Sequence, residues 1–196
     1  MSTAGCDWQF GPVDVWLLPH TPGTRGEPQA RELLAGVFDT TPAALPLTRD
    51  ERSRPWLIGE LARYGTGWSH SGGHLLLALG EGARLGVDLE RQRPRKQMRE
   101  VIRRFFHLEE IAWLDALDDS DCEHWFFRVW CAKEALLKAH GHGISFGLEK
   151  LRFAPDAAGA LQLVWCDPGL GDATRWHLHE WQATEDFRAA LAWYPL

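Results

Sequence analysis

The sequence predicts an α+β fold of two similar lobes related by pseudo-twofold symmetry, each an antiparallel sheet packed with helices. Residues 29–90 hold a helix followed by strands, and residues 123–193 repeat that order. Two strands, 74–80 and 84–90, flank a short linker that suits an antiparallel hairpin. A chain of 196 residues with 45% hydrophobic content and eleven Trp can build a packed core. We place the lobe boundary between residues 92 and 93, giving an N-terminal lobe, 1–92, and a C-terminal lobe, 93–196.

The N-terminal lobe is expected to begin with a strand over VDVWLL, residues 13–18, which Pro19 ends. The segment QARELLAGVF, residues 29–38, has apolar side chains at helical spacing and predicts a helix. Residues 39–67 are interrupted by three prolines and are expected to form a loop. The apolar run HLLLALG (74–80), the linker EGA and the alternating RLGVDLE (84–90) then complete the predicted hairpin.

The C-terminal lobe is expected to hold helices near 96–105, 108–117 and 123–139, followed by strands over 160–165, 175–181 and 187–193. Gly141 and Gly143 follow the third helix, and glycine is the usual residue at a helix C-terminus.

Composition excludes several classes of protein. A formal net charge of −6 argues against a nucleic-acid binder. No apolar run reaches the ~20 residues that cross a bilayer, and the N-terminal segment lacks the pattern of a secretory signal. The four Cys form no CxxC pair. We therefore expect reduced, buried thiols in a cytoplasmic protein.

Asp88 and Glu90 share one face of the predicted strand, because side chains alternate along it while Leu85, Val87 and Leu89 point the other way. Two carboxylates about 6.5 to 7 Å apart along a strand can share one divalent cation. Carboxylate oxygens favour Mg²⁺ or Mn²⁺ over zinc. An exposed strand face would carry the same residues, so this pattern alone leaves both interpretations open.

The segment WSHSGG, residues 68–73, precedes the first strand of the predicted hairpin. The hairpin would place Ser69, His70 and Ser71 at the same end as Asp88 and Glu90. Hydroxyls, an imidazole and backbone amides suit phosphate oxygens. A capped turn before a strand is the alternative.

Glu134 lies on the same helical stripe as Phe127, Trp130, Cys131 and Lys138. A buried carboxylate needs a cation partner. Lys138, one turn further along, is one candidate, and a metal ion shared with Asp88 and Glu90 is the other. Spacing alone leaves the choice open.

Three blocks in order carry a family resemblance: SRP leading to WSHSG, then GVDLE, then WCAKEALLKAHGHGI. The chain resembles the Sfp-type 4′-phosphopantetheinyl transferases, whose pattern runs G-K-P, S-H-S, G-[IV]-D-[IV]-E and W-x-x-K-E-[AS]-x-x-K-x-x-G-x-G. The likeness spans about Arg31 to the end and includes RFF with Glu110 four residues on. Ser53 and Arg54 replace the glycine and lysine of G-K-P, although arginine also binds phosphate.

The resemblance implies a reaction and a partner. A carrier-protein serine would take the 4′-phosphopantetheine arm of coenzyme A and release 3′,5′-ADP, in a Mg²⁺-dependent reaction at a site between the lobes. The family's chains are expected to act as cytoplasmic monomers, here in secondary metabolism, without nucleic acid or membrane. A Mg²⁺-dependent pyrophosphate hydrolase and a non-catalytic carrier-protein binder are the alternatives.

The resemblance also implies roles for individual residues. The metal ligands are Asp88, Glu90 and Glu134. The catalytic residues are Glu134, Lys138 and His70, with Glu134 a candidate base. Coenzyme A contacts are expected from Arg54, Ser69, His70, Lys133 and Lys138. Arg25 and Arg31 are candidates for the 3′-phosphate, although Arg31 could equally be a solvated helix residue.

The run RQRPRKQMREVIRR, residues 91–104, holds seven basic residues against one acidic residue. Carrier proteins in this family's reactions are typically acidic, so Arg95, Lys96 and Arg99 are candidates for steering such a partner. A solvated helix face is the alternative.

Overall fold

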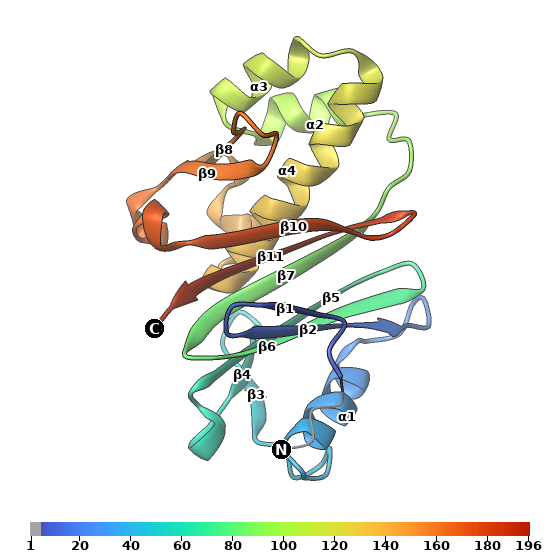
Figure 1. The fold of residues 1–196 in the computed structure, drawn as a ribbon, viewed down its shortest axis with the longest axis vertical. Coiled ribbons are helices and arrows are strands. Elements are labelled where there is room, and N and C mark those ends of the chain that lie inside the picture. The colour runs from blue at the N-terminus through green and yellow to red at the C-terminus, as the bar shows by residue number, and fades with distance from the viewer. Residues whose placement is uncertain (1–4) are drawn as a thin grey trace.

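The computed structural model describes residues 5–196, and the first four residues of the N-terminal segment discussed above lie outside them. The chain forms two lobes stacked along its long axis (Figure 1). Each lobe combines an antiparallel sheet with helices, which confirms the predicted α+β class. No helix within residues 5–196 has the length and apolar character needed to cross a bilayer.

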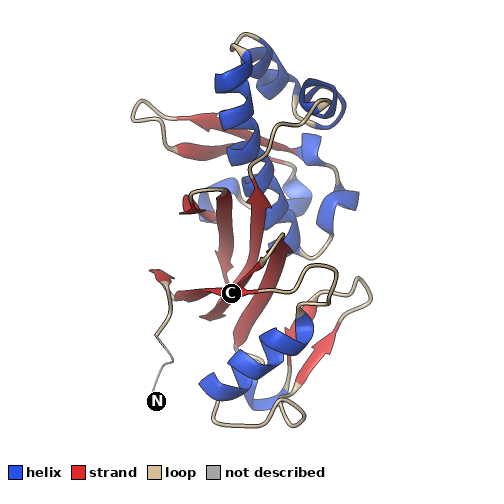
Figure 2. Ribbon diagram, turned by 90° about the vertical axis from the view of Figure 1, so that its right-hand side faces the viewer, coloured by secondary structure: helices blue, strands red, loops and turns tan. Residues whose placement is uncertain are grey.

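The lower lobe is built on a sheet of order β1-β2-β6-β5: β1 (Trp8–Phe10), β2 (Val13–Pro19), β6 (His74–Glu81) and β5 (Tyr64–Ser71). Helix α1 (Glu27–Val37) and the hairpin β3 (Leu47–Arg49) and β4 (Pro55–Leu57) cover one face (Figure 2). In β6, Leu75 and Leu77 pack toward α1, whereas Leu76 and Ala78 enter the core between the lobes. The continuous apolar run of this strand is therefore buried on both faces.

The upper lobe is built on a sheet of order β10-β11-β7: β10 (His177–Thr184), β11 (Phe187–Pro195) and β7 (Ala83–Arg91). The long helix α4 (Asp119–His140) crosses one face of this sheet. Helices α2 (Met98–Phe105) and α3 (Leu108–Asp115) and the hairpin β8 (Leu151–Pro155) and β9 (Leu161–Cys166) pack around α4. Within residues 5–196, five short 3₁₀ turns lie outside these elements: Gly59–Leu61, Gly143–Phe146, Leu148–Lys150, Pro168–Leu170 and Ala173–Arg175.

The predicted hairpin of residues 74–90 is wrong, although both of its strands exist. β7 pairs with β11, with Asp88 opposite Ala190, and β6 pairs with β2 and β5. Gly82, at φ +62°, turns the chain from one sheet into the other. Leu76 and Leu85 consequently belong to the same hydrophobic core between the two sheets. A turn that changes sheet has the same sequence signature as a hairpin turn, so the pattern could not separate them.

The predicted loop 39–67 also differs, since it contains β3, β4 and the start of β5. β5 runs beside β7 in the same direction, with Gly67 against Gly86 and Ser69 hydrogen-bonded to Asp88. Ser69 and His70 therefore lie at the end of β7 that carries the carboxylates, as expected. They lie there because β5 runs alongside β7, and not because of a hairpin. The division of the lobes after residue 92 stays a prediction. β7, which precedes that boundary in the sequence, belongs to the sheet of the upper lobe.

Helix α4 ends where the sequence predicts but begins four residues before the predicted start at residue 123. Asp118 caps its start by accepting the Asp121 N–H at 2.9 Å, and Gly141, at φ +94°, ends it. All four cysteines are free, and Cys122, Cys131 and Cys166 are buried while Cys6 is half-buried.

Gly86 lets α4 lie directly on β7. A Cβ atom there would lie 2.3 Å from the Ala139 nitrogen and 2.4 Å from the Ala135 oxygen, and both are backbone atoms that a side-chain rotation cannot move. The helix could accommodate a side chain only by moving away from the strand.

We therefore expect Gly86→Ala to lower the free energy of unfolding by about 1–3 kcal/mol, the usual cost of overpacking. Urea denaturation measures the loss. Gly36→Ala is the matched control, because a Cβ on that exposed glycine of α1 meets nothing within 4 Å and favours the helix. Equal stability of the two variants would contradict the close approach.

Candidate active site

Asp88 lies at the centre of a polar cluster to which three elements contribute. Its Oδ1 atom is 2.6 Å from Lys138 Nζ of α4 and accepts a hydrogen bond from Ser69 Oγ of β5 at 3.1 Å. Lys138 also donates to Ser69 at 3.1 Å, so the three side chains close a triangle. Burial opposes the charge of Lys138, but the carboxylates of Asp88 and Glu134 outweigh burial and raise the pKa of Lys138.

Glu90 projects from the same face of β7 and is held by two donors. Its Oε2 atom lies 3.0 Å from the Arg95 guanidinium, and its Oε1 atom accepts the indole N–H of Trp130 at 3.2 Å. Burial and the nearby carboxylate of Asp88 raise the pKa of Glu90, despite the opposing charge of Arg95.

Glu134 faces the same cluster from α4 and is 6% exposed. Within the described chain, no hydrogen bond or ion pair engages its carboxylate, because Lys138 pairs with Asp88 instead. The helical Glu134–Lys138 ion pair that the sequence left open is therefore not formed. Burial, followed by repulsion from Asp88, raises the pKa of Glu134 to about 7.

The carboxylates of Asp88, Glu90 and Glu134 have the chemistry to bind a divalent cation. In the conformations observed, no three His, Cys, Asp or Glu side chains in residues 5–196 are close enough together to hold one. Asp88 Oδ2 is buried without a hydrogen-bond partner, and the Glu134 carboxylate beside it is unpaired. Carboxylate oxygens of this kind are the ligands that Mg²⁺ and Mn²⁺ prefer.

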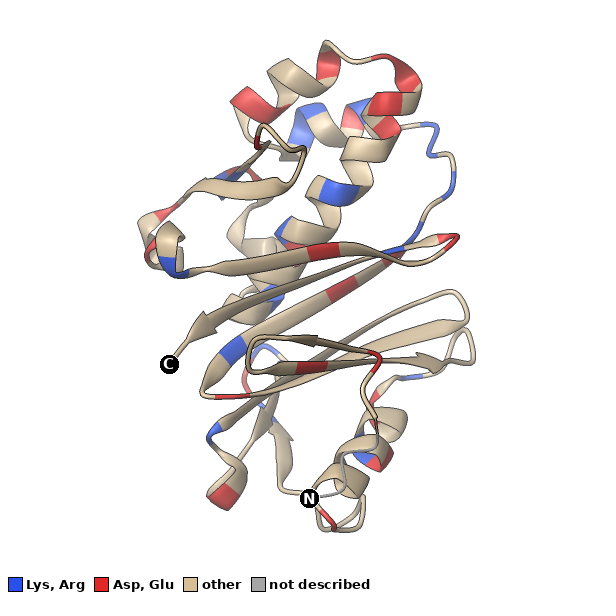
Figure 3. Cartoon of the chain, viewed as in Figure 1, with Lys and Arg blue, Asp and Glu red and all other residues tan. Residues whose placement is uncertain are grey.

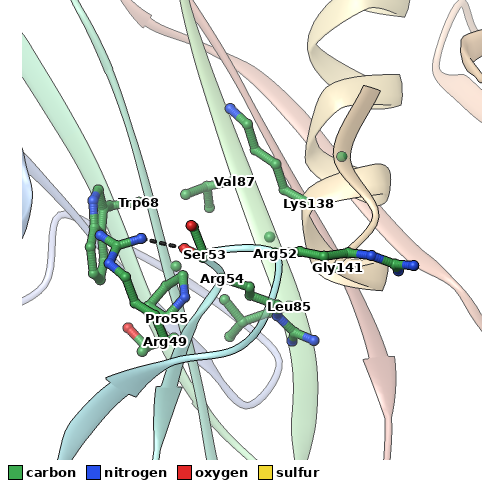
Figure 4. A pocket seen from close by; sticks show the side chains of 14 residues that line it. Arg49, Arg52, Ser53, Arg54, Pro55, Trp68, Leu85, Val87, Lys138 and Gly141 are labelled. Carbon is green, nitrogen blue, oxygen red and sulfur yellow. Dashed lines mark hydrogen bonds between the residues drawn. The ribbon is translucent and has the colours of Figure 1, made fainter. Parts of the chain in front are cut away.

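A pocket of about 220 Å³ opens beside Lys138. The turn between β3 and β4 forms one wall, and β5, β7 and the C-terminal end of α4 form the others (Figure 4). Its lining carries Arg49, Arg52, Arg54 and Lys138 and, among the described residues, no carboxylate. Guanidinium groups bind phosphate oxygens in bidentate fashion, so this lining suits a phosphate-bearing ligand.

The turn between β3 and β4 directs Arg54 into this pocket. Asp50 Oδ1 accepts the backbone N–H groups of Arg52 and Arg54, each at 2.9 Å. Ser53 adopts φ +65°, the left-handed conformation that favours glycine, which accounts for the glycine of the G-K-P pattern. The Nε atom of Arg54 is buried without a partner, so an incoming anion could satisfy it.

Ser69 and His70 both reach the site but face opposite sides of β5. Ser69 contacts Asp88. His70 is exposed in a shallow depression with Arg25 and Arg49, next to the pocket, and its ring stacks on His20 with centroids 4.7 Å apart. Partial burial, together with the charges of His20 and Lys138, lowers the pKa of His70.

The structure does not bring Arg31 to the pocket. Its guanidinium contacts Glu27 at 2.9 Å and donates to the Leu47 carbonyl at 2.8 Å, which fixes α1 to β3. The expected contact with a 3′-phosphate is therefore replaced by a structural role.

The prediction that Lys133 contacts coenzyme A is contradicted by its position. Its Nζ atom is fully buried, 2.7 Å from Glu110, and donates to the carbonyls of Leu148 at 2.7 Å and Leu151 at 2.5 Å. These partners occupy the three ammonium donors. Burial lowers the pKa of Lys133 to about 8. Lys133 and Glu134 are adjacent on α4, and adjacent side chains of a helix point in different directions. Lys133 therefore points into the core of the upper lobe.

The segment between β7 and α2 carries basic residues along one side of the molecule (Figure 3). Two of the three predicted carrier contacts have internal partners. Arg95 of this segment contacts Glu90, and Arg99, in the first turn of α2, pairs with Asp119 at 2.8 Å and donates to the Leu117 carbonyl at 2.9 Å. Lys96 is exposed.

Sequence reasoning missed Arg49, Arg52 and Trp130 as members of the site. Arg49 and Arg52 lie within five residues of Arg54, so their clustering was a usable signal. Trp130 is the first residue of the W-x-x-K-E block and shares the helical stripe of Glu134, so its position near the carboxylates was also indicated.

Comparison with known proteins identifies the family. The profile of the 4′-phosphopantetheinyl transferase superfamily matches residues 84–192. The 4′-phosphopantetheinyl transferase HetI of Nostoc sp. is 32% identical over 180 residues, covering 88% of this chain and 72% of the relative. A putative 4′-phosphopantetheinyl transferase of Synechocystis sp. is 31% identical over 172 residues, covering 83% and 68%. This chain belongs to the 4′-phosphopantetheinyl transferase superfamily.

Solved structures also resemble the chain. A Bacillus anthracis holo-(acyl-carrier-protein) synthase in complex with CoA (3′,5′-ADP) aligns with 57% of this chain and 94% of its own, at 21% identity and a TM-score of 0.47.

Replacing Glu110 tests the structural role of Lys133. Glu110→Gln would leave the buried ammonium without its counter-charge, so we expect a loss of about 3–5 kcal/mol in the free energy of unfolding. Glu81→Gln is the control, because it breaks the exposed Arg63–Glu81 pair and should cost at most about 1 kcal/mol. Urea denaturation compares them. Similar losses in both variants would contradict a buried ion pair at Lys133.

The raised pKa of Glu134 predicts a pH-dependent stability in metal-free buffer. The unfolded carboxyl loses its proton near its ordinary pKa of 4.5 and the folded one only near 7, so stability should fall as pH rises through this window. Glu134→Gln should remove up to about 3 kcal/mol of that fall. Urea denaturation between pH 4 and pH 8 with EDTA measures it. The exposed Glu32→Gln should keep the wild-type profile, and parallel profiles for wild type and Glu134→Gln would contradict the raised pKa.

Proposed function

We propose that this chain transfers the 4′-phosphopantetheine arm of coenzyme A to a serine of an acyl- or peptidyl-carrier protein and releases 3′,5′-ADP. One observation carries the proposal in a member of this superfamily: the carboxylate cluster on β7 and α4 borders an arginine-lined pocket, with Lys138 shared between them. One side suits a cation and the other suits phosphates.

In this proposal the serine Oγ attacks the β-phosphorus, and the bond from that phosphorus to the bridging oxygen breaks. The leaving 3′,5′-ADP keeps the bridging oxygen. Arg52 and Arg54 bind phosphate oxygens, and Lys138, at the junction of pocket and cluster, stabilises negative charge that develops on them. Glu134 accepts the serine proton, since its carboxylate faces the cluster from α4 and is only 6% exposed.

Asp88, Glu90 and Glu134 would hold a divalent cation, Mg²⁺ or Mn²⁺. When bound, the ion supplies charge neutralisation to the pyrophosphate. Ser69 and Lys138 orient Asp88 through the contacts described above. His70, in the adjoining depression, is positioned to donate to a phosphate that extends out of the pocket.

We also propose that the chain works as a monomer in the cytoplasm. Four free cysteines are compatible with a reducing compartment.

The test is incubation with coenzyme A, Mg²⁺ and a panel of apo carrier proteins, read by intact mass. The expected result is a mass gain of one phosphopantetheine arm on a carrier and one 3′,5′-ADP per transfer. Asp88→Asn should lose this activity. Release of 3′,5′-ADP without a carrier mass gain would instead indicate a pyrophosphate hydrolase, and carrier binding without either product would indicate a non-catalytic homologue.

Arg54→Ala should weaken coenzyme A binding about tenfold, equivalent to ~1.4 kcal/mol, and reduce its salt dependence because one charge pair is lost. Isothermal titration calorimetry at two salt concentrations measures both effects. Arg175→Ala removes an equal charge from an exposed residue outside the pocket and should bind as the wild type does. An unchanged affinity in Arg54→Ala would place the phosphates elsewhere.

The exposed charges of the 91–104 run are proposed to steer the carrier. Because Arg95 and Arg99 have internal partners, the informative variant is Arg93→Glu with Lys96→Glu, both exposed. We expect a several-fold higher KM for the carrier and an unchanged affinity for coenzyme A, since rim charges act mainly on association. Arg175→Glu serves as the control, and an unmoved carrier KM would contradict steering.

A further inference from the structure

Arg95 differs from the other basic side chains of its segment. Residues 92–97 belong to no helix or strand, and Arg93 and Lys96 are exposed there. Arg95 instead points inward, to within 3.0 Å of Glu90 Oε2. An exposed segment thus sends one cation into the carboxylate cluster.

Aromatic rings of α4 hold this guanidinium in place. Its carbon lies 5.5 Å from the ring centroids of Phe126 and Phe127 and 5.7 Å from that of Trp130. Rings at this distance attract a cation. Trp130 also donates its indole N–H to the other oxygen of Glu90. Both oxygens of Glu90 are therefore occupied by side chains that contact one another.

The charges of the cluster make this contact consequential. Three carboxylates, Asp88, Glu90 and Glu134, face two internal cations, which leaves one carboxylate without an ion pair among the described residues. Lys138 neutralises Asp88 and Arg95 neutralises Glu90. A divalent cation held by Glu90 would lie beside the positive charge of Arg95, and like charges this close repel.

We infer that Arg95 is an internal counter-cation that competes with a divalent metal ion for Glu90, so that it sets the metal affinity of the cluster. The inference rests on the metal site of the proposed function. When a metal ion binds, the Arg95 guanidinium leaves Glu90 and turns toward solvent. Metal binding thereby changes the conformation of residues 92–97. Arg95 is a positioning residue, because it acts through Glu90.

The experiment measures metal binding without turnover. Free Mn²⁺ is quantified by electron paramagnetic resonance during titration of the wild type, Arg95→Gln, Arg95→Lys and the control Arg93→Gln. Arg93→Gln removes the same charge from the same segment without a contact to Glu90. We expect the apparent Kd for Mn²⁺ to fall by up to about fivefold in Arg95→Gln, the upper end of the scale for one partly exposed ion pair. Arg95→Lys, which keeps the charge, should stay nearer the wild type, and Arg93→Gln should bind as the wild type does.

Two further measurements locate the effect. The gain in affinity should disappear when Glu90→Gln is added to Arg95→Gln. In the wild type, Mg²⁺ should shift the indole N–H resonance of Trp130, assigned with Trp130→Phe, because that group shares Glu90 with Arg95. Thermal melting of each variant confirms that it is folded.

An unchanged or higher Kd in Arg95→Gln, an equal gain in Arg93→Gln, or a gain that survives Glu90→Gln would overturn the inference. Failure to bind Mn²⁺ in every folded variant would overturn it together with the metal site. The carrier mass assay separates the two proposals: metal-dependent transfer with an unchanged Kd in Arg95→Gln would defeat only this inference. A tighter Kd without transfer to any carrier would defeat only the proposed function.

Discussion

The backbone of α4 rests on β7 at Gly86, and the arrangement of the charged groups depends on that contact. On β11, the buried Ala190 and Ala192 pair with Asp88 and Gly86, and their small side chains extend the surface on which the helix lies. With the helix this close, Trp130, Glu134 and Lys138, spaced along one side of α4, meet Asp88 and Glu90, spaced along one side of β7. A larger residue at position 86 would separate the two sets of side chains even if every charged residue were kept.

Neighbouring residues of α4 have opposite roles because the helix is buried on two sides. Lys133 is turned into the upper lobe, where Glu110 and two carbonyls satisfy its charge. Glu134 is turned toward β7, where it has no ion pair within residues 5–196 and burial raises its pKa to about 7. The ion pair on one side anchors the helix, and the unsatisfied carboxylate on the other side is available for chemistry.

Two compartments of opposite charge meet at Lys138. The described residues that line the pocket toward the β3–β4 turn include arginines and no carboxylate, and the cluster on β7 and α4 carries three carboxylates. The pocket has excess positive charge, which phosphates would compensate, and the cluster has excess negative charge, which a cation would compensate. A ligand that carries phosphates together with a bound cation therefore matches both compartments. The partnerless Nε of Arg54 and Oδ2 of Asp88 are the atoms at which this imbalance is most direct.

The sequence by itself determined what depends on local pattern. Alternation along GVDLE placed Asp88 and Glu90 on one face, helical spacing placed Glu134 and Lys138 on one stripe, and Gly141 ended α4 where expected. Ordered blocks of residues were enough to indicate the family. Tertiary structure decided which partner each group has. β7 pairs with β11 rather than with β6, and Lys138 forms its ion pair with Asp88 rather than with Glu134. Internal partners also bind Lys133, Arg31, Arg95 and Arg99. The physical reason is that periodicity specifies the direction of a side chain relative to its own element, whereas a charge is paired by whichever group another element brings within about 3 Å.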